Sequence, residues 1–129
     1  MVLVDSSIWI DYFNGRRTHD TDRLDELLDG EDLLTGDLIV TEILQGFRHD
    51  HDFERARLAL EQLPHADMLG RELALASARN YRLLRQHGIT IRKTIDVMIA
   101  TFCIHHCRVL LHGDRDFAPM SEHLGLRTL

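Results

Sequence analysis

The sequence predicts an α/β fold in which helices cover both faces of a short parallel β-sheet. Short apolar runs of the kind that form buried strands occur at residues 2–4, 33–35 and 109–111. Between these runs, apolar residues recur at helical spacing, as Leu24, Leu27 and Leu28 do. When strands alternate with helices, right-handed crossovers make the strands parallel and place helices on both faces of the sheet.

The same spacing assigns the remaining elements in chain order. The helices are expected at residues 8–13, 22–28, 37–47, 53–63 and 69–87, from residue 94 onward, and in a last segment that ends at residue 123. Gly15, Gly30 and Gly88 each stand just past the end of one of these helices, where glycine is the favoured residue. Two further short strands are expected at residues 65–68 and 127–129. Thr94 is the expected N-cap of the most apolar helix, which is apolar nearly all round and therefore buried.

Length and composition favour one globular domain, residues 1–129, in the cytoplasm. The chain has 129 residues, of which 44% are hydrophobic. It has no apolar stretch of the roughly 20 residues that span a bilayer and no signal-peptide start. Its net charge of −6 argues against a generic nucleic-acid coat, although the basic residues are Arg except for Lys93, and Arg binds phosphate bidentately.

Two His-containing segments resemble metal sites only weakly. Cys103 and Cys107 lie one helical turn apart near His106, but no fourth ligand is spaced to complete a zinc site. We therefore expect two reduced cysteines packed in the core. The alternating His and Asp of residues 48–52 fit a polar loop between helices that needs no ligand.

Four carboxylates are the candidate residues of a catalytic or metal-binding site. Asp5 and Asp114 each follow a predicted buried strand, so they belong to the same rim of a parallel sheet, where ligands of open α/β sheets bind. Asp96 stands in the first turn of the buried helix. Glu42 lies roughly 150° from the centre of its helix's apolar stripe, which is formed by Val40, Ile43, Leu44 and Phe47.

Each acid also has an ordinary structural explanation. Asp5 and Asp114 can cap the helices that follow them, Asp96 can complement a helix dipole, and Glu42 can be solvated. Crowded at one rim, however, they would repel one another, and a divalent cation would relieve that cost. Mg²⁺ and Mn²⁺ prefer oxygen ligands, activate water and stabilise charge on a phosphodiester.

Other site classes lack their signatures in this chain. It has no GxxxxGK loop for a nucleoside triphosphate and no Gly-x-Ser-x-Gly nucleophile. A receiver domain would need a Lys at the end of a later strand, but Lys93 follows no strand. A haloacid-dehalogenase-type phosphatase would need Asp-x-Asp after the first strand, and Ser7 takes the second position.

Four segments together resemble PIN domains of the VapC toxin type. They are VLVDSSIWI at residues 2–10, VTEIL at 40–44, RKTIDVMIA at 92–100 and LLHGDRDF at 110–117. They occur in the family's order and spacing and cover essentially the whole chain. The resemblance implies a Rossmann-like α/β/α sandwich and an Mg²⁺- or Mn²⁺-dependent endoribonuclease, the toxin of a toxin–antitoxin pair. It also implies a cognate antitoxin, an RNA substrate and a homodimer. The lack of a long apolar stretch predicts no membrane association.

The resemblance also assigns roles residue by residue. The catalytic acids carried over are Asp5, Glu42, Asp96 and Asp114. Metal binding is expected of Asp5, Asp96 and Asp114, with Asp116 as an assistant or substitute for the fourth acid. Ser6 matches a supporting hydroxyl, and Arg92 and Lys93 are candidates to hold substrate phosphates. Where the family often has Thr-Asn, residues 112–113 are His-Gly. The alternative is a non-catalytic module whose acidic rim holds a basic segment of a partner.

Overall fold

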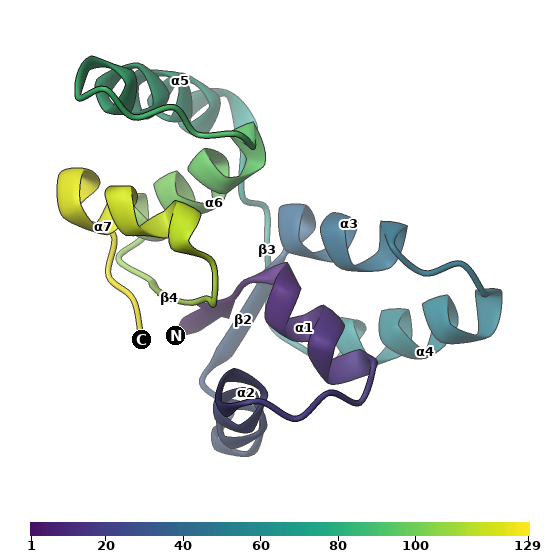
Figure 1. Cartoon of the computed structure of the whole chain (residues 1–129). Coiled ribbons are helices and arrows are strands. Elements are labelled where there is room, and N and C mark those ends of the chain that lie inside the picture. Colours follow the sequence, from purple (N-terminus) through teal and green to yellow (C-terminus); the bar gives the residue numbers. More distant parts are fainter.

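The computed structural model describes the whole chain, residues 1–129, and has the predicted α/β architecture (Figure 1). Its four strands are parallel and lie in the order β3-β2-β1-β4. In chain order the elements are β1 Val2–Val4, α1 Ser6–Phe13, α2 His19–Gly30, β2 Leu33–Gly36, α3 Asp37–Gln45, α4 Asp50–Glu61, β3 His65–Ala66, α5 Gly70–Gln86, α6 Thr94–His105, β4 Val109–Leu111, the 3-10 helix η1 Arg115–Phe117 and α7 Ala118–Leu124.

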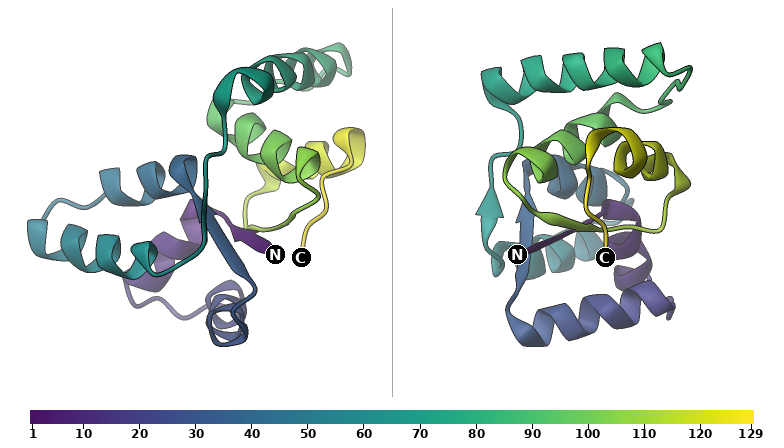
Figure 2. Two further views of the ribbon diagram at one scale, coloured as in Figure 1. Left: turned by 180° about the vertical axis from the view of Figure 1, so that it is seen from behind. Right: turned by 90° about the vertical axis from the view of Figure 1, so that its left-hand side faces the viewer.

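The helices form two groups on opposite sides of the sheet. Helices α1 to α4 gather on one side, and α5, α6 and α7 pack together on the other (Figures 1 and 2). The chain first runs outward from β1 to β2 and β3, and then returns across the sheet to form β4 on the other side of β1. The order of strands therefore reverses between β1 and β4, and ligands of open α/β sheets bind at such a reversal, outside the carboxyl ends of the strands.

The core is made by the sheet and the helix faces that cover it. Residues Val2–Val4 are all buried, as are Leu110 and Leu111 of β4. Helix α6 is buried along most of its length, as its all-round apolar sequence predicts. Among the buried residues only two carry a carboxylate, Asp5 and Asp96, with 5% and 3% of their surface exposed. An uncompensated buried carboxylate is costly, so these two positions need a physical explanation.

Three details differ from the expectation. Thr94 is the first residue of α6, and the residue before it, Lys93, is the N-cap without a capping side-chain bond. The predicted C-terminal strand is a single bridge between Thr128 and Leu110. On α3 the buried residues are Ile39 and Ile43, whereas Val40 is only half-buried. The sheet and α1 select this face, which the spacing of apolar residues alone did not identify.

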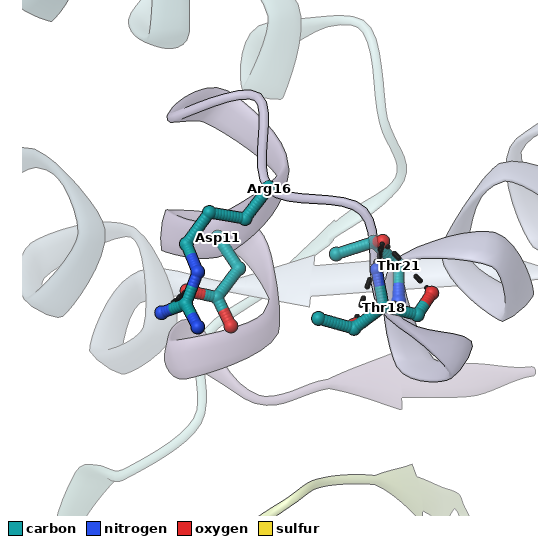
Figure 3. Close-up of polar contacts among 4 residues, drawn as sticks. All are labelled: Asp11, Arg16, Thr18 and Thr21. Carbon is teal, nitrogen blue, oxygen red and sulfur yellow. Dashed lines mark hydrogen bonds and ion pairs between the residues drawn. The ribbon is translucent and has the colours of Figure 1, made fainter.

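The connection from α1 to α2 is fixed by local polar contacts. Arg16 pairs with Asp11 of α1 across 3.3 Å, and Thr18 and Thr21 form a reciprocal capping box at the start of α2 (Figure 3). Such a box satisfies two backbone N–H groups that the helix itself leaves free. No helix of the protein is both long and apolar enough to span a bilayer.

Candidate metal centre

Asp5 is the single residue between the end of β1 and the start of α1. Its backbone N–H donates to the carbonyl of Leu111 at 2.9 Å, which holds the ends of β1 and β4 together. The side chain accepts a hydrogen bond from the Ser7 hydroxyl at 2.9 Å and makes no bond with the geometry of a helix cap. Burial raises the pKa of Asp5, and the Ser7 hydroxyl and the nearby N–H groups of Ser6 and Ser7 offset part of that rise. Asp5 thus makes no well-formed capping bond, and its surroundings as a whole disfavour the charged form of this carboxylate.

Glu42 approaches the same rim from helix α3. It is half-buried, and its Oε1 accepts a hydrogen bond from the Ser6 hydroxyl at 3.1 Å. Because the buried face of α3 is centred between Ile39 and Ile43, Glu42 lies about 80° from that centre and not 150°. Burial raises the pKa of Glu42, and so does the negative charge of Asp5. Glu42 is therefore on the flank of the packed face, not on a solvated back face.

Asp96 exposes a smaller fraction of its surface to solvent than any other acidic residue of the chain. It lies in the first turn of α6, and its Oδ2 atom is buried without a hydrogen-bond partner. Burial raises the pKa of Asp96 to about 6, Lys93 opposes that rise, and Asp5, Glu42 and Asp114 add to it. The last three influences mean that Asp96 of α6 lies within electrostatic range of carboxylates that follow β1, stand on α3 and lie in the loop after β4.

Asp114 and Asp116 complete the acidic group from the loop after β4. Asp114 is the N-cap of η1, and its Oδ1 accepts the N–H of Asp116 at 2.9 Å. Carboxylate oxygens of Asp96, Asp114 and Asp116 all lie within 4.8 Å of one another, and no other group of three acids, cysteines or histidines in the protein is this tight. The structure thus brings together the acids that the sequence selected, with Asp5 and Glu42 outside the tightest three.

Two cations stand beside the acids. Lys93 precedes α6, and its charge lowers the pKa of both Asp96 and Glu42. The Arg92 guanidinium pairs with Asp116 at 3.3 Å, while its side chain remains 80% exposed. Such an exposed ion pair contributes little to stability. Arg92 could therefore leave Asp116 and contact a ligand at little cost.

The donor set fits a hard divalent cation. It consists of carboxylate oxygens, and the unpartnered Oδ2 of Asp96 is a buried acceptor that a cation would satisfy. The segments that contain histidine or cysteine do not compete as metal sites, and Cys107, which was expected in the core, is exposed. Burial raises the pKa of the Cys103 thiol to about 12, so it is not a thiolate, and Asp50 and Asp52 simply occupy the first turn of α4.

Comparison with known proteins identifies the family. A family model described as PIN domain matches residues 2–122. The chain belongs to the PIN-domain family. Ribonuclease VapC11 of Mycobacterium tuberculosis is 29% identical to this PIN domain over 119 residues, which cover 91% of this chain and 89% of the relative.

Two solved structures share the fold of this PIN domain. The structure of VapBC2 from Rickettsia felis bound to a promoter DNA fragment superposes with a TM-score of 0.78, at 14% identity, over 100% of this chain and 98% of the other. A toxin–antitoxin complex from Klebsiella pneumoniae superposes with a TM-score of 0.70, at 23% identity, covering 92% of this chain and 91% of that one. The predicted α/β/α architecture is confirmed by this likeness.

Sequence reasoning did not select every residue that this PIN domain places at the rim. Ser7, whose hydroxyl holds Asp5, and His112, whose ring nitrogen holds the backbone of Asp114, were not among the candidates. For Ser7 a signal was present, because Ser side chains often bond a group two residues away. For His112 the only signal was its position directly after a strand at the rim.

Proposed function

We propose that this PIN domain is a metal-dependent endoribonuclease and the toxin of a toxin–antitoxin pair, with Mg²⁺ or Mn²⁺ as its cofactor. The domain is the whole chain, residues 1–129. VapC11, which shares 29% of its residues over most of both chains, is a ribonuclease by name, and this supports the reaction class. The acidic group supports the metal dependence.

The observation that carries the proposal is that buried Asp96 lies among acids from separate elements and that its Oδ2 has no hydrogen-bond partner. A folded protein gains no stability from such an arrangement, because desolvation and repulsion both penalise the charged forms. A carboxylate group that is costly to the fold and concentrated at the strand reversal is typical of a functional site.

We assign the roles as follows. Asp96, Asp114 and Asp116 would hold the cation, with Asp5 beside them. The bound cation supplies an activated water and stabilises charge that develops on the scissile phosphate. Glu42, whose pKa is raised by burial and by Asp5, is suited to accept a proton from the attacking water. Ser6 orients Glu42 through its hydrogen bond, and Arg92 and Lys93 attract the RNA phosphates.

Purified protein tests this proposal directly. Incubation with RNA and Mg²⁺ or Mn²⁺ should produce internal cleavage that stops when a chelator is added. Asp5→Asn and Asp96→Asn should abolish cleavage while the protein stays folded. Asp50→Asn is the matched control for Asp96→Asn, since Asp50 also occupies the first turn of a helix but lies outside the acidic group. Cleavage by Asp96→Asn at the wild-type rate would contradict the assignment. Binding of a basic peptide without cleavage at any metal concentration would instead support the non-catalytic module.

We also propose a cognate antitoxin as partner and a homodimer as the assembly. One similar solved structure is a toxin–antitoxin complex, and this chain has a groove between α1 and α4 that could take a partner segment. The groove has a volume of about 510 Å³, and Phe13 and Phe47 contribute its aromatic lining. Ala59→Arg should fill it, since Ala59 is exposed there. We expect this variant to lose inhibition by the antitoxin and to retain RNA cleavage.

A further inference from the structure

His112 follows the last residue of β4 and is held in place from two sides. It is half-buried, and its ring lies 4.9 Å from the ring of buried Phe117, with 50° between the two planes. Its Nδ1 atom accepts a hydrogen bond from the backbone N–H of Asp114 at 3.2 Å. The imidazole therefore links the buried base of the loop to the residue that bears the fourth acid.

The hydrogen bond that His112 accepts from Asp114 is the first of two successive bonds between a side chain and the backbone. Asp114, whose N–H is held by His112, accepts in turn the N–H of Asp116 at 2.9 Å. Each bond joins a side chain to the backbone two residues on, the pattern by which short polar side chains fix turns. With these two bonds in place, the carboxylates of Asp114 and Asp116 lie within 4.8 Å of a carboxylate oxygen of Asp96.

Helix α2 approaches the loop beside His112. A Cβ atom placed on Gly113 would lie 3.0 Å from Oδ2 of Asp20, a residue in the first turn of α2. This oxygen is the end of a flexible side chain and Gly113 is exposed, so the contact does not by itself fix the loop. The bond from the N–H of Asp114 to Nδ1 of His112 is the contact that ties the backbone of residues 112–114 to a half-buried side chain.

We propose that His112 is a positioning residue for the metal centre, which sets the backbone of Asp114 so that Asp114 and Asp116 face Asp96. The inference rests on the proposed function, because it concerns the same acids. His112 does not belong to the tight acidic group, and its Nδ1 is engaged by the backbone. Outer residues that orient metal ligands typically change metal affinity by about 10- to 100-fold when replaced.

Two substitutions of His112 test the contribution of its aromatic ring and that of its acceptor atom separately. His112→Phe keeps an aromatic ring against Phe117 but has no acceptor for the N–H of Asp114. His112→Asn loses the ring but carries an oxygen that can accept an N–H two residues on, as Asp114 already does for Asp116. If either variant fails a thermal-unfolding check, His112→Leu supplies an apolar side chain without an acceptor, and His112→Thr supplies an acceptor without the ring.

Calorimetric titration with Mn²⁺ gives a readout that does not depend on RNA cleavage. We expect the Mn²⁺ dissociation constant of His112→Phe to rise about tenfold, and that of His112→Asn to stay within about threefold of the wild type. In cleavage assays, His112→Phe should need correspondingly more Mn²⁺ for half-maximal rate, while its KM for RNA at saturating Mn²⁺ stays unchanged. A purely structural role would not produce this selective dependence on metal concentration.

Each other result has a definite meaning. Wild-type Mn²⁺ affinity in His112→Phe, or equal losses of affinity in both variants, would overturn the inference. Loss of cleavage in both variants with unchanged Mn²⁺ affinity would also overturn it, because the imidazole would then act on the substrate. A wild-type protein that binds Mn²⁺ with the expected variant pattern but leaves RNA intact would contradict the proposed function and leave the positioning role supported.

Discussion

The Ser6 hydroxyl donates to Glu42 Oε1 across 3.1 Å and thereby connects helix α1 to helix α3 at the acidic rim. Ser6 is itself buried, so this bond is shielded from water on one side. The bond favours the charged form of Glu42, against the burial and the Asp5 charge that raise the pKa of this side chain. A single hydroxyl thus orients Glu42 and limits how far its proton affinity rises.

Ser6→Ala should therefore weaken catalysis through Glu42. Without the hydroxyl the pKa of Glu42 rises further, so the acid limb of the cleavage-pH profile should move to higher pH. We expect the rate at neutral pH to fall by about two- to tenfold, which corresponds to the loss of one hydrogen bond. Ser77→Ala is the control, because Ser77 is also buried but lies on α5 and bonds neither Glu42 nor Asp5. An unchanged acid limb in Ser6→Ala would show that Glu42 is not the proton acceptor.

The sequence predicted the strands and the convergence of acids because both follow from local pattern. Asp5 and Asp114 stand just past apolar runs, and parallel strands carry such positions to one rim whatever the details of packing. The orientation of Glu42 was less predictable, because the buried face of α3 is decided by contacts with distant elements and not by the spacing of its own apolar residues. The same holds for Thr128, which forms one bridge where a strand was expected.

The fine geometry of the metal centre could not be predicted from the sequence. The bond from Asp114 to His112 depends on where Phe117 places the imidazole, and Gly113 matters because Asp20 of α2 approaches it. Both contacts join segments whose relative placement only the folded chain defines. The catalytic roles of the individual acids remain predictions that the variants described here test.

The stability of the metal-free protein should depend on pH through Asp96. Its pKa is about 6 in the folded protein, against an ordinary value of 3.8. Between these pH values the folded state holds a proton that the unfolded chain has released, so the contribution of Asp96 to the free energy of unfolding decreases as pH rises from about 4 to 6. Urea unfolding in chelator across this range should show a steeper decrease in the wild type than in Asp96→Asn, in which Asp5 and Glu42, whose pKa values are also raised, still contribute. Parallel curves for the two proteins would contradict the raised pKa.

Asp96→Asn should stabilise the metal-free protein at neutral pH while it removes activity. The substitution eliminates a buried charge whose raised pKa corresponds to a penalty of about 1 to 3 kcal/mol in the free energy of unfolding. Asp50→Asn should instead lower stability by less than about 1 kcal/mol, because it removes only a favourable charge at a helix N-terminus. If Asp96→Asn raises the free energy of unfolding and Asp50→Asn lowers it at the same pH, then Asp96 is an acid kept for function and Asp50 is one that stabilises its helix.

Mn²⁺ should raise the thermal stability of the wild type, and more strongly at neutral pH than below pH 6. A cation that binds only the folded state adds about 2.7 kcal/mol at 100 times its dissociation constant. Protons compete for Asp96 below its pKa, so the gain should shrink in acid. Thermal unfolding with and without Mn²⁺ measures this gain. The same increase in Asp96→Asn would place the cation elsewhere.

Arg92→Ala should weaken RNA binding without weakening the metal centre. Arg92 pairs with Asp116 at 3.3 Å, but its side chain is 80% exposed, so loss of this ion pair should change Mn²⁺ affinity by less than about threefold. The KM for RNA should rise about three- to tenfold, and its dependence on salt should become shallower by about one phosphate contact. Titration with Mn²⁺ and cleavage at several salt concentrations measure the two effects separately.

Arg16→Ala provides a closely matched control for that substitution. Arg16 pairs with Asp11, also at 3.3 Å, and its side chain is 70% exposed, but the pair lies in the connection between α1 and α2 and not among the acids (Figure 3). The two substitutions remove the same charge and a similar ion pair. We expect only Arg92→Ala to change the KM for RNA, because only Arg92 stands beside the acids where the scissile phosphate would lie. Equal effects would mean that RNA is attracted by the overall charge of the protein, and the assignment of Arg92 would be wrong.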